Sequence, residues 1–182
     1  MTFSGLKNEN YDGLYLIMMC LVLRLMSIER PIRRLDFRVF QHATEDRGKV
    51  ALALGLVSGT AEATESRAEG YHGNPIIVLE TTVSGRAPID DFWARLRSAR
   101  LCGGVEENLE ERINDSGELF IRFDKQEAVQ GRLALSSGDD VVLGRGRVLS
   151  TVRGQQVRAD RAGAVEVMRA FLRELEKNTD IA

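Results

Sequence analysis

Hydrophobic and polar residues alternate in two short stretches of the chain, which is the pattern of strands that bury one face only. The stretches are Leu35–Ala43 and Leu119–Asp124. The apolar positions of the alternation are Leu35, Phe37, Val39, Leu119, Ile121 and Phe123. The positions between them include Arg38, Phe40, His42, Phe120 and Arg122. We expect two strands whose apolar set faces the helices and whose second set faces away from them.

The rest of the chain predicts further strands and helices in succession. The β-branched run Ile76–Val83 and the polar stretch 61–70 predict two strands that are joined by a turn. Helix entrances and apolar spacing predict helices after Thr44, over Pro88–Leu101 and Val105–Ile113 and after Asp160, with a helical turn at Lys125–Gly131 and one or two strands over Asp139–Val152. This order predicts an α+β domain with helices packed on one face of a mixed or mostly antiparallel sheet.

The most apolar run of the chain lies near its beginning, at Leu14–Met26. It has 13 residues and contains Arg24, so it is shorter than the roughly 18 residues that a membrane-spanning helix needs. Acidic residues precede it where a signal peptide would be basic. Two interpretations stay open for residues 1–25, an over-extended translation start or a flexible or docked arm. We expect residues 26–182 to form a single domain that folds without them.

Composition and cysteine usage indicate an ordinary globular protein of a reducing compartment. Hydrophobic residues make up 43% of the chain and charged residues 29%, which is enough apolar material for one buried core. The two cysteines, Cys20 and Cys102, lie far apart in the sequence and have no histidine nearby, so the pattern indicates neither a zinc site nor a disulfide. We predict a cytoplasmic location and no membrane association.

Charge is distributed unevenly along the chain. The formal net charge of −2 argues against a generally basic nucleic-acid-binding protein. Residues 122–161 nevertheless hold eight basic and five acidic side chains, whereas residues 87–118 hold four basic and eight acidic ones. A local basic surface on an acidic protein is therefore compatible with the sequence.

The groups that could perform catalysis do not form a recognisable motif. Five candidates lie near the ends of predicted strands: His42, Glu45, Asp46, His72 and Asp124. The chain has no paired histidines on a helix, no nucleophile in a tight glycine turn, no phosphate-binding loop and no dinucleotide fingerprint. The glycines of Leu143–Val148 are expected to permit a bulge or close packing. We predict no catalytic residue, no metal site and no cofactor, and a metal-dependent phosphoesterase is the third hypothesis.

The second set of alternating residues suggests a binding surface. It places the rings of Phe40 and Phe120 among Arg38 and Arg122. Single-stranded nucleic acid is bound by this combination, because bases stack on aromatic or guanidinium planes while the cations pair with phosphates. The pattern also permits another interpretation, in which the N-terminal segment or a helix on the second face covers both rings.

Four stretches in this order and spacing resemble a known family. They are FQHATED (Phe40–Asp46), GYHGNPIIVLE (Gly70–Glu80), LFIRFDKQEAVQG (Leu119–Gly131) and GDDVVLGRGRV (Gly138–Val148). Together they resemble the archaeal RNA-binding-domain proteins that are described as predicted exosome subunits, over about residues 32–175. The resemblance implies a fold similar to that of the ribosomal protein that binds 5S RNA. It also implies an archaeal cytoplasmic origin, a non-catalytic RNA-binding role and exosome subunits as partners.

With this resemblance, residues of the turn before Pro75 join the candidate set. Gly70, Gly73, Asn74 and Pro75 are suited to build the turn itself, whereas His72 either contacts RNA or caps a backbone carbonyl. The full set of RNA-binding candidates is Arg38, Phe40, His42, Tyr71, His72, Asn74, Phe120, Arg122, Lys125 and Arg132. The second hypothesis is a protein-interaction subunit that uses the acidic region 104–118 and does not touch RNA. A continuous basic strip through Arg122, Lys125 and Arg132 would favour RNA.

Overall fold

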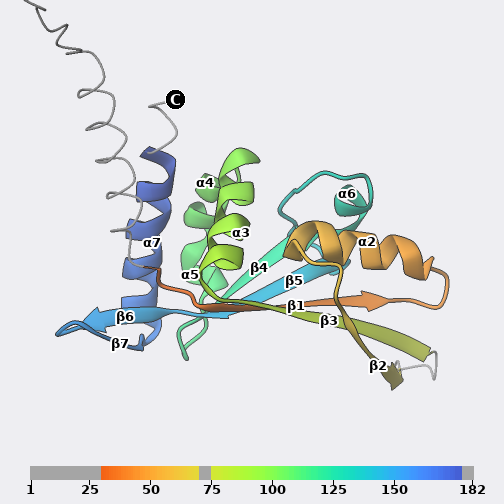
Figure 1. The fold of residues 1–182 in the computed structure, drawn as a ribbon, viewed down its shortest axis with the longest axis horizontal. Coiled ribbons are helices and arrows are strands. Elements are labelled where there is room, and N and C mark those ends of the chain that lie inside the picture. Colours follow the sequence, from red (N-terminus) through yellow and green to blue (C-terminus); the bar gives the residue numbers. More distant parts are fainter. Residues whose placement is uncertain (1–29, 70–74, 178–182) are drawn as a thin grey trace, which may run out of the picture.

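The computed structural model describes residues 30–69 and 75–177, and its largest element is a five-stranded antiparallel sheet (Figure 1). The strands are β1 (Arg34–Gln41), β2 (Thr64–Glu69), β3 (Pro75–Ser84), β4 (Glu118–Asp124) and β5 (Val141–Arg147). They follow the order β2, β3, β1, β5, β4 across the sheet, and each neighbouring pair is antiparallel. The sheet places β1, the first predicted strand, at its centre.

The described helices all lie on one side of this sheet, as Figure 1 shows. They are α2 (Arg47–Ser58), α3 (Arg86–Ser98), α4 (Cys102–Glu107), α5 (Leu109–Arg112), α6 (Lys125–Val129) and α7 (Arg161–Lys177). The predicted α+β fold with helices on one face is therefore confirmed. None of these described helices is long and apolar enough to cross a membrane.

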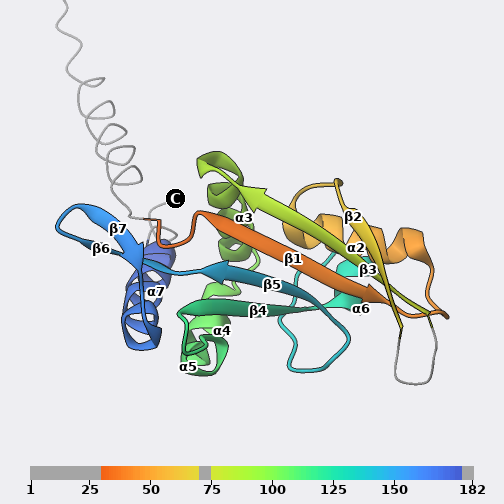
Figure 2. The same ribbon diagram turned by 90° about the horizontal axis from the view of Figure 1, so that it is seen from below.

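A second, two-stranded sheet extends beyond one end of the larger one (Figure 2). It consists of β6 (Leu149–Val152) and β7 (Gln155–Arg158). The backbone N–H of Leu149 donates to the carbonyl of Pro31 at 2.7 Å, so the segment before β1 supports this hairpin. The sequence predicted β6 as part of one or two strands, but it did not predict β7.

Two helix entrances differ from the prediction. Asp46 rather than Thr44 caps α2, because its carboxylate accepts a hydrogen bond from the backbone N–H of Lys49 at 2.9 Å. Helix α3 begins at Arg86, and Pro88 lies within its first turn, where a missing backbone N–H costs nothing.

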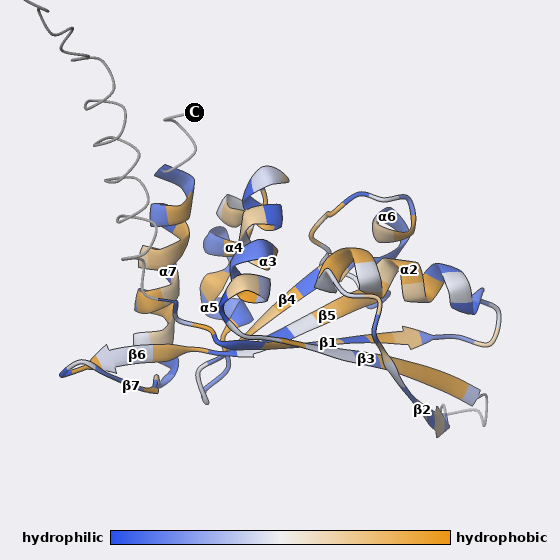
Figure 3. Ribbon diagram, viewed as in Figure 1, coloured by the Kyte–Doolittle hydropathy of each residue, from blue (hydrophilic) through white to orange (hydrophobic). Residues whose placement is uncertain are grey.

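The core lies between the sheet and the helices. Phe92 of α3 is fully buried, and its ring lies 5.4 Å from Phe37, 5.1 Å from Trp93 and 6.3 Å from Phe123, measured between centroids. Each of the other three rings is tilted or edge-to-face relative to the ring of Phe92, and these are favourable arrangements for aromatic pairs. Figure 3 shows hydrophobic and hydrophilic residues mixed along α3, α4 and α7, as expected for helices that cover a core with one side only.

Candidate nucleic-acid interface

The face of the five-stranded sheet that no described helix covers is called the uncovered face here, and the register arranges its side chains in rows. One row runs from β3 to β4 through Thr82, Asp36, Arg145 and Phe120. The next row runs from β2 to β4 through Thr64, Glu80, Arg38, Leu143 and Arg122. Charged, hydroxyl, apolar and aromatic side chains are thus interleaved rather than segregated.

Two phenylalanines belong to the uncovered face, and they lie apart. Phe40 is 41% exposed although it is a large hydrophobic residue, and Phe120 is half-buried. Two strand spacings and four residues along the strands separate them, because Phe120 lies in the row of Asp36. At about 4.8 Å per strand and 3.3 Å per residue, this is roughly 16 Å. The two rings are therefore too far apart for one base to contact both of them.

Arginines and carboxylates form ion pairs across the uncovered face. Arg38 binds Glu80 at 2.6 Å, and Arg34 binds Asp36 at 2.8 Å. Arg145 lies 3.7 Å from Asp36. Burial raises the pKa of Asp36, but hydrogen bonds from Arg34 and Thr82 and the charges of Arg34 and Arg145 outweigh it, so the pKa lies below its ordinary value. The carboxylate of Asp36 is therefore ionised at neutral pH and holds two guanidinium groups in place.

A hollow of about 590 Å³ opens on the same face. Its lining includes Arg34, Asp36, Glu80, Phe120, Leu143 and Arg145. These residues come from β1, β3, β4 and β5, so the hollow follows from the pairing of strands that are distant in the sequence. The lining combines charged groups with the apolar surfaces of Phe120 and Leu143.

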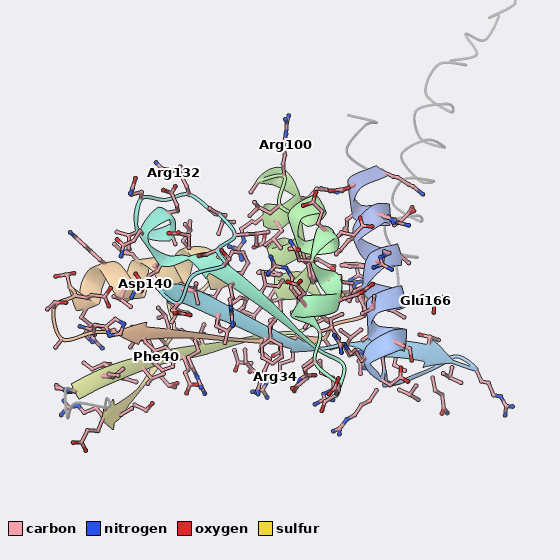
Figure 4. The ribbon with its side chains drawn as sticks, turned by 180° about the vertical axis from the view of Figure 1, so that it is seen from behind. Arg34, Phe40, Arg100, Arg132, Asp140 and Glu166 are labelled. Carbon is pink, nitrogen blue, oxygen red and sulfur yellow. The ribbon has the colours of Figure 1, made fainter. Side chains whose placement is uncertain are left out.

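Four of the predicted RNA-binding residues belong to the uncovered face. These are Arg38, Phe40, Phe120 and Arg122. Arg122 is exposed and forms no ion pair with any residue of the described part of the chain. None of the described helices covers the ring of Phe40, so a helix of residues 30–69 or 75–177 does not cover this face (Figure 4). Cover by the N-terminal segment concerns residues 1–29, which lie outside the described part of the chain.

The other predicted residues lie elsewhere. His42 follows the end of β1, where it is exposed and donates its backbone N–H to Glu45 at 2.8 Å. Arg132 lies on the helical side beside α6 and pairs with Glu127 at 2.7 Å (Figure 4). The turn candidates Tyr71, His72 and Asn74 lie outside the described residues.

Arg122, Lys125 and Arg132 do not form a continuous basic strip, because Lys125 is buried and Arg132 lies on the helical side, so this criterion does not favour RNA. Lys125 is 1% exposed, and its ammonium group binds Asp140, Glu45 at 2.7 Å and the carbonyl of Phe40 at 3.1 Å. The reason is its position in the alternation, because Lys125 continues the inward-facing series that ends in Phe123. Burial raises the pKa of Asp140, but hydrogen bonds from Lys125 and Gln126 and the charges of Lys125 and His42 bring it below its ordinary value.

Sequence reasoning missed Arg34, Arg145 and Arg147, which also lie on the uncovered face or at its end. For Arg145 and Arg147, the feature that could have predicted this orientation is the GRGR stretch of β5. A methyl group at Gly144 would come within 2.9 Å of the Phe37 ring, so this position must face the crowded core. The arginines that alternate with glycine must then face away. The predicted close packing at these glycines is confirmed, and the strand pairs continuously on both sides without a bulge.

The candidates for metal binding have other partners. Asp46 caps α2, and Asp124 caps α6 by accepting from the N–H of Glu127 at 2.9 Å. Glu45 binds Lys125. In residues 30–69 and 75–177, no group of three or more histidine, cysteine, aspartate or glutamate side chains is placed to hold a metal ion.

The acidic region 104–118 packs against arginines of the same chain. Glu106 binds Arg173 of α7 at 2.6 Å, and Glu110 lies 3.3 Å from Arg169. Glu118 binds Arg147 at 2.9 Å. Much of the acidity of this region is therefore balanced within the chain.

Comparisons with known proteins agree on one family. A family model described as RNA binding matches residues 34–148, which include all five strands of the larger sheet. An RNA-binding protein of Pyrococcus abyssi is 36% identical over 126 residues, covering 64% of this chain and 82% of that protein. The solved structure of a DUF54 protein from Methanothermobacter thermautotrophicus is 32% identical, with a TM-score of 0.65, and covers 78% of this chain and 98% of that one. A DUF54 structure from Archaeoglobus fulgidus is 31% identical, with a TM-score of 0.66, and covers 77% and 99%.

Proposed function

Because the chain belongs to the RNA-binding family whose model matches residues 34–148, we propose that it binds RNA through the uncovered face of its sheet and catalyses no reaction on it. The observation that carries the proposal is the exposed ring of Phe40 on the uncovered face. Phe40 lies two residues from Arg38, and further arginines belong to the same face. The helical side of the same strands buries its phenylalanines, so the fold itself does not require an exposed one.

The arrangement suits single-stranded or locally unpaired RNA. A ring can stack on a base only when the base is free of its own helix, as it is in loops and single strands. Phe40 and Phe120 provide two such positions roughly 16 Å apart by the strand spacings. Arg122, which has no ion pair among the described residues, is available for a phosphate between or beside them.

The proposal extends to a cellular role. We infer from the resemblance to predicted exosome subunits that the protein acts in the cytoplasm with the exosome or another RNA-processing assembly. Ultraviolet crosslinking in the native cells, followed by sequencing of the bound RNA and mass spectrometry of chemically crosslinked subunits, tests both parts. Recovery of RNA without subunits of such an assembly would remove the assembly from the proposal and leave RNA binding.

The direct test measures binding of the full chain to a fluorescently labelled single-stranded RNA of mixed sequence. Phe40→Ala is expected to weaken binding by about 1–3 kcal/mol, because a stacked base loses its aromatic partner. The slope of affinity against salt concentration should stay nearly unchanged, since stacking releases no counterions. Fluorescence anisotropy at several salt concentrations measures both quantities.

Leu52→Ala is the matched control for this test. Leu52 is also an exposed hydrophobic residue, 67% accessible, but it lies on α2 on the helical side of the sheet. The variant should bind RNA as the parent does. If the parent binds no RNA, or if Phe40→Ala binds as tightly as Leu52→Ala, the role passes to the protein-interaction hypothesis.

A further inference from the structure

The hollow on the uncovered face has a lining that a phosphate-binding track would not have. A surface that only follows a nucleic-acid backbone gains from arginines and is weakened by carboxylates. This hollow contains both Asp36 and Glu80, together with the apolar surfaces of Phe120 and Leu143. Carboxylates and apolar surfaces are suited to the edges and faces of bases, respectively.

The two carboxylates differ in what they can still bind. One oxygen of Asp36 accepts from Arg34 at 2.9 Å and from Thr82 at 2.8 Å, and the other faces Arg145. Asp36 is therefore engaged on both oxygens. It serves to position the arginines of the hollow.

Glu80 keeps one oxygen available. Both nitrogens of Arg38 that contact it, Nε and a terminal one, bind the same oxygen, Oε1, at 2.6 Å. No residue of the described part of the chain donates to Oε2, and the Glu80 side chain is 39% exposed. Arg38 thus holds the carboxylate through Oε1, while Oε2 remains an acceptor without a donor among the described residues.

We propose that this hollow binds one unpaired guanine base and that Glu80 recognises its Watson–Crick edge; the proposal rests on the proposed RNA-binding function. Guanine presents two adjacent donors, N1–H and the N2 amino group, which lie close enough together to donate to the same acceptor, the available Oε2 of Glu80. Uracil presents a single N–H between two carbonyl oxygens, and these oxygens are repelled by the negative charge. Adenine and cytosine place an acceptor nitrogen beside their amino group, so they offer one favourable contact instead of two.

The apolar surfaces supply the rest of the recognition. Phe120 and Leu143 lie on neighbouring strands, β4 and β5, and both line the hollow. Leu143 lies in the same row as Glu80, two strand spacings away, so the face of a purine can pack on Leu143 while its edge reaches Glu80 on β3. Phe120 lies farther from Glu80 and offers its ring to a neighbouring base. Arg145 and Arg34 are placed at the same hollow for the phosphate of that nucleotide.

The test uses a short uridine RNA whose central base is guanine, hypoxanthine or uracil. Hypoxanthine differs from guanine only by the missing N2 amino group, so it removes one of the two donors. The parent protein should bind the guanine RNA at least about fivefold more tightly than either of the others, as for a pair of hydrogen bonds between a side chain and a base edge. Glu80→Gln, which keeps the size of the side chain, should abolish this preference, whereas Phe40→Ala should weaken all three RNAs alike.

The outcomes separate this inference from the function on which it rests. Tight binding of all three RNAs with equal affinity would overturn guanine recognition and leave RNA binding intact. Equal binding of the guanine and hypoxanthine RNAs, or a preference that survives Glu80→Gln, would also overturn it. Failure of the parent to bind any of the three would overturn the proposed function itself.

Discussion

The two faces of the sheet are built by the same strands and use phenylalanine in opposite ways. On the covered face, Phe37 and Phe123 pack around Phe92 and are almost completely buried. On the uncovered face, Phe40 is 41% exposed and Phe120 is half-buried beside a hollow. Residue type therefore does not decide whether a ring serves the core or a ligand. The parity of its position along the strand decides it.

The largest expected effect is the difference in stability between the two phenylalanines of β4. Phe123→Ala should lower the free energy of unfolding by about 3–5 kcal/mol, because it opens a cavity in the core beside Phe92. Phe120→Ala should cost much less, since its ring is only half-buried. Urea titration of both variants followed by circular dichroism measures the difference. Equal losses would mean that the uncovered face is covered in solution and that the stacking surface does not exist.

The second effect concerns the residue that connects the two faces. Lys125 lies on the covered side but donates to the backbone carbonyl of Phe40 and pairs with Glu45 and Asp140. Lys125→Met keeps the length of the side chain but leaves two neighbouring carboxylates without their cation, so we expect a loss of about 3 kcal/mol in unfolding free energy. Lys49→Met, at an exposed position of α2, is the control and should have almost no effect. Equal stability of the two variants would show that the buried cluster does not support the fold.

The burial of Lys125 also shows what could and could not be predicted from the sequence. Alternation correctly separated Phe37 from Phe40 and Phe123 from Phe120, because one buried face imposes a period of two. The membership of an archaeal RNA-binding family, expected from four motifs, is confirmed. Lys125 was a candidate phosphate contact because of its charge, but its position continues the alternation of the buried Phe123. A buried lysine is possible only with partners such as Asp140 and Glu45, and Glu45 lies 80 residues away in the sequence.

The hollow could not be predicted, because it depends on strand order and register. Arg145 lies beside Asp36 only because β5 pairs with β1, and Phe120 reaches the same row through β4. A single sequence contains no direct record of which strands are neighbours. The GRGR stretch did contain a usable signal, since glycines opposite Phe37 and Leu35 imply that the arginines face outward.

The third effect is a small pH-dependent stabilisation that belongs to the uncovered face. Because the pKa of Asp36 in the folded protein lies below its ordinary value of 3.8, its ionised form stabilises the fold above that pH. This contribution is lost as the pH falls through the folded-state pKa. Asp36→Asn should therefore lower the free energy of unfolding by less than about 1 kcal/mol at neutral pH, as for other partly exposed ion pairs. Thermal unfolding from pH 7 down to about pH 2 measures the gap, which should close at the acid end; a constant gap would contradict the role of ionised Asp36.

The smallest effect, and the most specific for the comparison of the two faces, is a change in the salt dependence of RNA binding. Arg122 lies on the uncovered face without an ion pair among the described residues, whereas Arg132 lies on the helical side and pairs with Glu127 at 2.7 Å. Replacing either arginine by alanine removes one positive charge, so both variants change the net charge equally. The two variants therefore differ in their place on the molecule and not in their charge.

Only Arg122→Ala should remove a phosphate contact. The slope of log affinity against log salt concentration should then become shallower by about 0.7 for single-stranded RNA. Arg132→Ala should keep the slope of the parent. Anisotropy titrations at several salt concentrations measure both slopes. The opposite result, a shallower slope for Arg132→Ala alone, would place the RNA on the helical side and assign the uncovered face another ligand.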